Sequence, residues 1–267
     1  MLTVISTFVE RRESMRRTNL YIHYDSVTNH VMTRAINFIA NDFTERYFPQ
    51  NMILAEAPAD FGRYDVMTNF KILRGETEIM SYFTTARKEK LRLSNWIDFE
   101  SLEAMHQLTP NEIAELLYLF HANKSLKSAF FYKLQNNYVY LTLPNGLNKM
   151  YYRYVTHFYP RFQRVMREQM KELINEGQSI FAIRKQEVKE MPDAVVEEVS
   201  PLFAAGLKVN FNQAYLKGTR WHVPLNIIED QLTLLSKDQR PNDHLGFVIY
   251  DSNTEHWEVN LDLLESK

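Results

Sequence analysis

Residues 125–146, SLKSAFFYKLQNNYVYLTLPNG, change their hydrophobic pattern halfway along. In the first half, Phe130, Phe131 and Leu134 are spaced as on the apolar face of a helix. From residue 138 to residue 143 the pattern alternates, which predicts a β-strand. The Pro-Asn-Gly that follows at 144–146 is typical of a turn. The stretch therefore predicts a helix that leads into a β-hairpin.

Helical patterns lie on both sides of this unit. Thr109 and Pro110 are typical of a helix start, with Thr109 as the cap and Pro110 at the first position. Residues 159–175 carry a long amphipathic pattern, with Pro160 near its start and Gly177 after its end. We therefore expect an α+β protein with mixed strands and helices, whose helical middle surrounds one β-hairpin.

The flanking parts of the chain mix both patterns. Strand patterns occupy residues 19–26, 51–56, 179–184, 247–250 and 257–261. Helical spacing occupies residues 30–48, 98–106 and 225–235, and residues 69–83 predict a hairpin that turns at 74–76. We expect three parts: a mixed α+β part at 1–105, a basic helix–hairpin–helix middle at 106–177, and an acidic mixed α+β part at 178–267. No internal repeat is evident.

Composition excludes several classes of function. The 267 residues contain no cysteine, which excludes disulfides, zinc–thiolate sites and cysteine nucleophiles. Glycine is scarce, and neither a G-x-G-x-x-G nor a P-loop motif occurs. There is no apolar run of about 18 residues, and the first residues do not resemble a secretory signal. We expect a soluble, cytoplasmic protein without a membrane partner.

Positive charge is concentrated in the middle of the chain. Residues 122–171 hold nine lysines and arginines and a single acid, Glu168, whereas residues 186–267 hold fourteen acids and seven bases. Eleven aromatic residues lie among the nine bases. Nucleic-acid phosphates need Lys or Arg, and unstacked bases need flat side chains, so this segment has both ingredients of a nucleic-acid site. The candidate phosphate-binding residues are Lys124, Lys127, Lys133, Lys149, Arg153, Arg161 and Arg164.

The same asymmetry has a second explanation. The aromatics can belong to the core, while the bases form a solvated face that pairs with the acidic C-terminal part. A further short basic segment, residues 86–93, lies outside the middle. We predict a nucleic-acid-associated regulatory or accessory protein; a protein–protein adaptor, or a homo-oligomer formed through the aromatic-rich middle, stays open as an alternative.

The order of predicted elements in the middle resembles a winged helix. Three helices, at 98–106, 110–121 and 125–136, precede the hairpin; the second contains NEIAELL, and FYKLQNNYVYL leads into the hairpin. The resemblance implies that the third helix enters the major groove of DNA and that the hairpin contacts the backbone.

The segment HYDSVTNH at residues 23–30 indicates a different class of function, in which the protein holds a metal ion or a small molecule. On a strand His23 and Asp25 point to one face, and His30 follows closely, which would suit zinc or non-haem iron. A small-molecule-binding domain or enzyme with a site near these residues is therefore an alternative. No H-E-x-x-H motif occurs, and polar residues on a surface strand also explain the pattern, so we predict no metal site and no cofactor.

Overall fold

The computed structural model describes residues 18–43, 45–55, 61–122, 133–143, 146–176, 185–228 and 244–261. It contains both helices and a large antiparallel sheet, so the protein is an α+β protein. The helices are α1 (Gly75–Lys88), α2 (Leu102–His106), α3 (Pro110–Ala122), α4 (Tyr159–Asn175) and α5 (Asp193–Val199). The strands are β1 (Leu20–Asp25), β2 (His30–Arg34), β3 (Asn51–Leu54), β4 (Arg63–Tyr64), β5 (Lys71–Arg74), β6 (Trp96–Phe99), β7 (Tyr138–Thr142), β8 (Leu147–Tyr152), β9 (Leu207–Val209), β10 (Tyr215–Lys217), β11 (Arg220–Ile227), β12 (Gly246–Asp251) and β13 (His256–Leu261). None of the described helices has the length and apolarity needed to cross a membrane.

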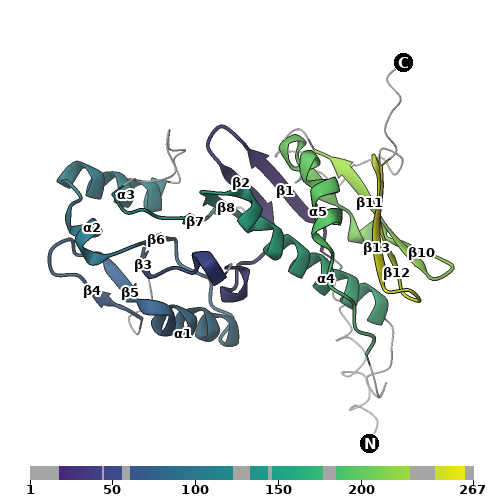
Figure 1. Cartoon of the computed structure of the whole chain (residues 1–267), viewed down its shortest axis with the longest axis horizontal. Coiled ribbons are helices and arrows are strands. Elements are labelled where there is room, and N and C mark those ends of the chain that lie inside the picture. Colours follow the sequence, from purple (N-terminus) through teal and green to yellow (C-terminus); the bar gives the residue numbers. More distant parts are fainter. Residues whose placement is uncertain are drawn as a thin grey trace, which may run out of the picture.

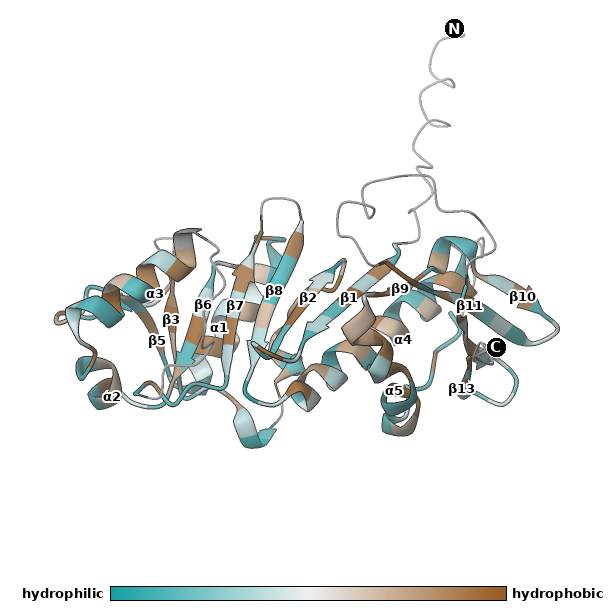
Figure 2. Cartoon of the chain, turned by 90° about the horizontal axis from the view of Figure 1, so that it is seen from above, coloured by the Kyte–Doolittle hydropathy of each residue, from teal (hydrophilic) through white to brown (hydrophobic). Residues whose placement is uncertain are grey.

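In the described part of the chain, the strands form one antiparallel sheet of 13 strands. Its order is β13-β12-β11-β9-β1-β2-β8-β7-β6-β3-β5-β4, with β10 paired to β11. Figure 2 shows these strands side by side, from β5 at one end to β13 at the other. Strands far apart in sequence are neighbours, because β1 pairs with β9 and β2 with β8. All three predicted parts of the chain therefore contribute strands to the same sheet.

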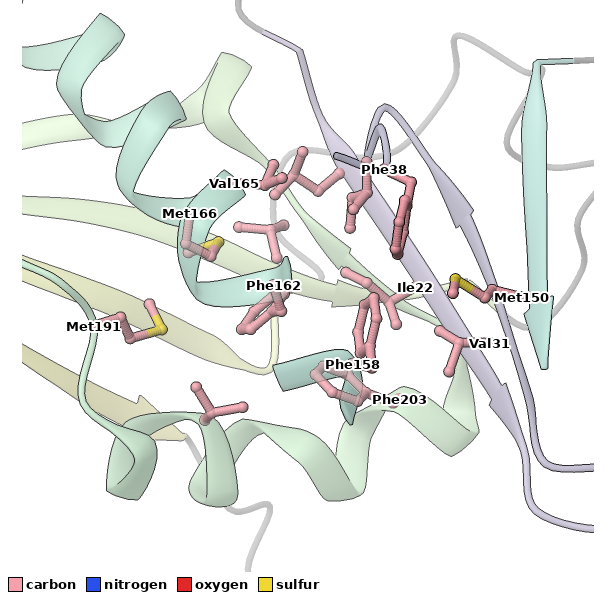
Figure 3. Close-up of a cluster of buried hydrophobic side chains, with 14 of the residues drawn as sticks. Ile22, Val31, Phe38, Met150, Phe158, Phe162, Val165, Met166, Met191 and Phe203 are labelled. Carbon is pink, nitrogen blue, oxygen red and sulfur yellow. The ribbon is translucent and has the colours of Figure 1, made fainter. Parts of the chain in front are cut away.

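Helices cover the two faces of the sheet unequally. Figure 1 shows α1 and α3 on opposite sides of β3 and β6. The apolar side chains of α1, α4 and α5 share one buried cluster on one face, and those of α2 and α3 share a second cluster on the other. Figure 3 shows part of the first cluster, where Phe158 lies close to Ile22 of β1, and Phe162 and Met166 of α4 continue the cluster away from the strands.

The junction between β6 and β7 joins the two ends of the sheet. It has only two backbone register pairs, Trp96 with Tyr140 and Ile97 with Val139. Side-chain hydrogen bonds extend this junction beyond the two register pairs, one set at each end. The carboxylate of Asp98 accepts from the backbone N–H groups of residues 137 and 138 at 2.6–3.1 Å, and the amide oxygen of Asn95 accepts from the backbone N–H of Thr142 at 2.7 Å. We call this junction, with its two polar side chains, the β6–β7 seam.

Three β-hairpins share one loop sequence, which corrects the expectation that the chain has no internal repeat. The pattern Tyr-Asp-x-x-Thr-x-His/Phe occurs at 24–30, 64–70 and 250–256. In each loop the Asp side chain accepts from the backbone N–H two residues later, at 2.8, 3.1 and 2.9 Å. The penultimate residue has a positive φ in each: Asn29 (54°), Asn69 (57°) and Glu255 (55°). The repeat is local, and it fixes where each hairpin turns.

The predicted hairpin at 69–83 is wrong, because β5 ends at Arg74 and α1 begins at Gly75. Gly75 has a φ of 71°, but this left-handed residue starts a helix instead of closing a hairpin. The Glu78 side chain accepts from the backbone N–H of Arg74 at 2.8 Å, which stabilises the helix start. The buried side chains of α1 then recur every three or four residues.

Three helical predictions are also corrected. Residues 30–34 form β2, because they pair with both β1 and β8. Residues 225–227 belong to β11, which pairs with β9 and β12. The predicted helix at 98–106 divides into the end of β6 and the short α2. In the first two cases, strand pairing across the sheet overrides a local helical pattern.

Other predictions are confirmed. The alternating pattern at 138–143 forms β7, the helix predicted to begin at Pro110 is α3, and the helix predicted at 159–175 is α4. The strand patterns near 19–26, 51–56, 247–250 and 257–261 form β1, β3, β12 and β13. The predicted strand at 179–184, and most of the predicted helix at 125–136, lie outside the described residues.

Asp98 should make stability fall with rising pH. Burial raises the pKa of its carboxyl to about 7, although hydrogen bonds from the backbone N–H groups of Asn137 and Tyr138 oppose this. The pKa of Asp98 in the folded protein then exceeds its value in the unfolded chain. The stabilisation that Asp98 contributes is therefore fully present below the unfolded pKa and is lost as pH rises through about 7. Relative to D98N, the free energy of unfolding of the wild type should fall between about pH 4 and pH 8. Urea denaturation at several pH values measures this difference.

Asp65 provides a control, because its pKa is lowered where that of Asp98 is raised, and its effect on stability should change with pH in the opposite direction. Burial raises its pKa, but hydrogen bonds from His106 and Thr68 outweigh burial and bring the pKa to about 2. The stabilisation that Asp65 contributes is present above the unfolded pKa and is lost as pH falls toward about 2. The difference in the free energy of unfolding between the wild type and D65N should therefore change in acid. Parallel stability curves for the wild type and D98N above pH 4 would contradict the assignment to Asp98.

Candidate anion-binding pocket

A cavity of about 670 Å³ lies between α1, the β7–β8 hairpin and α4. Its walls are the end of α1 with residues 90–93, the segment 37–39 after β2, and one side of α4. The volume lies within the range of ligand pockets in proteins. Four basic side chains line the cavity, and Glu168 is its one acidic lining residue in the part of the chain that the structure describes.

Three of the bases lie at the outer edge of the cavity, on the chain that leaves α1. Arg87, Lys90 and Arg92 are exposed, and no acidic partner lies within ion-pair distance of them in the described ranges. Arg92 donates to the carbonyl oxygen of Leu143 at 3.3 Å, which ties this segment to the β7–β8 hairpin. We call Arg87, Lys90 and Arg92 the outer bases.

The end of α1 places Lys90 in an unfavourable backbone conformation. The backbone N–H of Leu91 donates to the carbonyl of Ala86 at 2.8 Å, which is the closing hydrogen bond of a Schellman motif. Lys90 has a φ of 55° at the position where this motif favours glycine. A non-glycine residue there costs about 1 kcal/mol. The sequence therefore keeps a lysine at a position where backbone energetics favour glycine.

The inner wall is formed by Arg164 of α4, which is held by two acids. Its guanidinium contacts the Asp42 carboxylate at 2.6 and 3.0 Å and the Glu168 carboxylate at 2.9 Å. Burial lowers the pKa of Arg164, but these two carboxylates outweigh burial and raise it. Arg164 is therefore a fixed cation whose charge Asp42 and Glu168 already balance.

Aromatic side chains form the floor of the cavity. Phe38, Phe83 and Tyr140 line it and are almost fully buried. The Tyr140 hydroxyl makes no hydrogen bond with the described residues, and its oxygen is not fully buried. Burial raises the pKa of this hydroxyl to about 12, while the charges of Arg161 and Arg92 oppose the shift. Tyr140 therefore lies within electrostatic reach of one arginine at the edge of the cavity and one behind its floor.

Arg161 lies behind the floor as a buried cation. It is 1% exposed, and its guanidinium carbon is 5.4 Å from the centre of the Phe38 ring. It donates to the carbonyl of Ile36 and contacts the sulfur of Met150 at 3.5 Å, and among the described residues its Nε has no hydrogen-bond partner. No described carboxylate forms an ion pair with it. Buried charges are normally paired, so Arg161 is an unusual component of a core.

The candidate residues predicted from the sequence do not meet on one surface. Lys133 pairs with Glu112 of α3 at 2.9 Å. Met150 packs in the α4 cluster, so its neighbour Lys149 points to the opposite face of β8. The charge of Arg153 acts on buried Asp98. Arg164 lines the pocket and Arg161 lies behind it against Phe38, while Lys124 and Lys127 lie outside the described residues.

The outer bases were not among the predicted site residues. The signal for them was present, because the segment 86–93 is short and basic. The aromatic residues of the middle segment are mostly core. Tyr138, Tyr140, Tyr151, Tyr152, Phe158 and Phe162 are at most 3% exposed, whereas Tyr154 is half exposed. Those six rings therefore do not form an exposed platform for stacked bases.

The alternative residues His23, Asp25 and His30 lie on the β1–β2 hairpin. Thr28 donates to Asp25 at 2.9 Å and lies 2.5 Å from the Nδ1 atom of His30. Burial, together with the charge of Lys149, lowers the pKa of His30 to about 4, so its imidazole is neutral near pH 7. In the part of the chain that the structure describes, no three His, Cys, Asp or Glu side chains are grouped closely enough to hold a metal ion.

Comparisons of the chain with protein-family models, with curated proteins and with solved structures found no match. The geometry and charge of the pocket are therefore the basis on which a function is proposed below.

Removing Asp42 should destabilise the protein much more than removing Glu168. Asp42 is almost fully buried, and D42N would leave the charge of Arg164 poorly compensated, which costs about 3 kcal/mol. Glu168 is 44% exposed, and E168Q should cost less than about 1 kcal/mol. Urea denaturation of both variants measures the difference. Equal losses would show that the two acids are equivalent partners of Arg164.

Proposed function

We propose that the protein is a nucleic-acid-associated accessory protein that binds the phosphates of a single strand at this pocket. The observation that carries the proposal is the set of three exposed outer bases, with no acidic partner in the described ranges, around a cavity of about 670 Å³. Lysine and arginine side chains that neutralise phosphates release counterions, which supplies most of the non-specific affinity for nucleic acid. A cytoplasmic location is part of this proposal.

The shape of the site favours a single strand over a duplex. The basic groups surround a concave pocket, whereas a duplex is usually read by a helix or ribbon that projects into its groove. A flexible single strand can bend to place a phosphate between the outer bases. The buried aromatics argue against stacking as the main source of affinity, so binding should depend strongly on salt.

The backbone at Lys90 supports a role for its side chain. Glycine would relieve the left-handed conformation at this position, yet the chain has lysine. Strained residues often lie at ligand-binding sites. A charged group at that position is explained if it contacts an anion.

The winged-helix arrangement is a second form of the proposal. It would use α3 and the β7–β8 hairpin, and most of its third helix, predicted at 125–136, lies outside the described residues. The outer edges of the hairpin are already paired, β7 with β6 and β8 with β2. A hairpin inside a sheet is less free to contact a DNA backbone, so the pocket is the stronger candidate.

Charge reversal at the outer bases should weaken binding. The variant R87E/K90E/R92E should bind a single-stranded oligonucleotide at least about tenfold more weakly at about 50 mM salt, because three phosphate contacts are lost. The slope of log K against log salt should fall by about 2 in magnitude. Fluorescence anisotropy at several salt concentrations measures both quantities.

The control variant is K185E/K189E/K217E, which changes the net charge equally at exposed lysines away from the pocket. It should keep most of the affinity. K90G is a second test, because it should leave stability unchanged or higher while weakening binding. If the wild type fails to bind at about 50 mM salt, or if both triple variants lose affinity equally, the proposal is wrong.

A further inference from the structure

We propose that the pocket takes the phosphorylated end of a strand, meaning a terminal phosphate monoester together with the next phosphodiester. This inference rests on the proposed function and names the substrate class of the same site. It predicts a preference for ends that carry phosphate over ends that carry hydroxyl.

The charge of the pocket supports this choice. Arg87, Lys90, Arg92 and Arg164 line it with Glu168, while Arg161 and Asp42 lie directly behind the lining. Positive groups in this set exceed negative groups by three. A phosphate monoester carries about 1.5 to 2 negative charges at pH 7, and each diester carries one. A terminal phosphate and its neighbouring diester therefore match the surplus, whereas one internal diester does not.

The floor of the pocket supports an end over an internal phosphate. Phe38, Phe83 and Tyr140 line the deeper side of the cavity, because they are almost fully buried whereas the outer bases are exposed. An internal phosphate continues into chain on both sides, so both sides of the strand would have to pass through the opening. A terminal phosphate has chain on one side only and can reach the floor.

A hydroxyl on the floor can donate to a phosphate. The Tyr140 hydroxyl makes no hydrogen bond with the described residues, and its oxygen is not fully buried, so a ligand in the cavity can reach it. Arg161 is buried behind Phe38 without a carboxylate partner in the described part, and its charge acts on Tyr140 from behind as that of Arg92 does from the edge. An anion placed at Tyr140 would lie in the field of both arginines and would compensate the buried charge.

The test compares oligonucleotides of one sequence that differ only at their ends. Unlabelled ten-residue strands with a 5′-phosphate, a 3′-phosphate or two hydroxyl ends compete against a labelled strand at about 100 mM salt, where contacts with internal phosphates are weakened. One phosphorylated strand should compete at least about tenfold better than the hydroxyl strand, because it adds a more highly charged anion. Equal competition by all three strands would overturn the inference while leaving the proposed function intact.

The variant Y140F removes only the floor hydroxyl. It should lose most of the preference for a phosphorylated end over a hydroxyl end, with circular dichroism confirming its fold. An unchanged preference in Y140F would overturn the role of the floor. A nucleoside monophosphate that competes as well as the phosphorylated strand would overturn the assignment of a strand end and indicate a free nucleotide. Failure of every oligonucleotide to bind would overturn the proposed function itself.

Discussion

The attachment of β7 to β6 is the constraint on which the position of the pocket depends. On one side of this seam lie β3 to β6 with α1, and on the other side lie the remaining long strands with α4. Two backbone pairs hold the seam, and Asp98 and Asn95 extend it with side-chain hydrogen bonds. The outer bases follow α1, whereas Arg164 belongs to α4. Their spacing across the cavity is therefore set by this seam together with the segment 38–42, which contacts Phe83 of α1 and Arg164 of α4.

Local sequence patterns predicted the helices and strands whose structure is determined by their own residues and not by pairing with distant strands. Helix α4 was predicted at its observed bounds, because its apolar face is continuous and Pro160 and Gly177 mark its ends. Strand β7 was predicted from strict alternation. Residues 30–34 and 225–227 carry helical spacing, but each joins strands that are distant in sequence. No local signal indicates such a partner, so tertiary pairing prevailed over the local pattern.

The candidate site was less predictable than the fold, because a count of charges along the chain does not show to which face of the sheet each side chain points. Lys149 and Met150 are neighbours in sequence, yet alternation along β8 sends them to opposite faces of the sheet. The basic segment at 86–93 lies near Arg164 through the pairing of β6 with β7 and through the segment 38–43, which contacts both α1 and α4. Among the predicted residues that the structure describes, Arg164 lines the pocket and Arg161 lies behind it, because both lie on the side of α4 that contacts the segment 36–42.

The three hairpin loops with the pattern Tyr-Asp-x-x-Thr bear on how this chain folds. Each loop joins strands that are adjacent in sequence, so β1–β2, β4–β5 and β12–β13 can form with little loss of chain entropy. The pairing of β1 with β9 brings together residues almost 190 positions apart, and such non-local contacts form slowly. We therefore expect folding to begin at these hairpins on a timescale of microseconds, and closure of the central sheet to be rate-limiting.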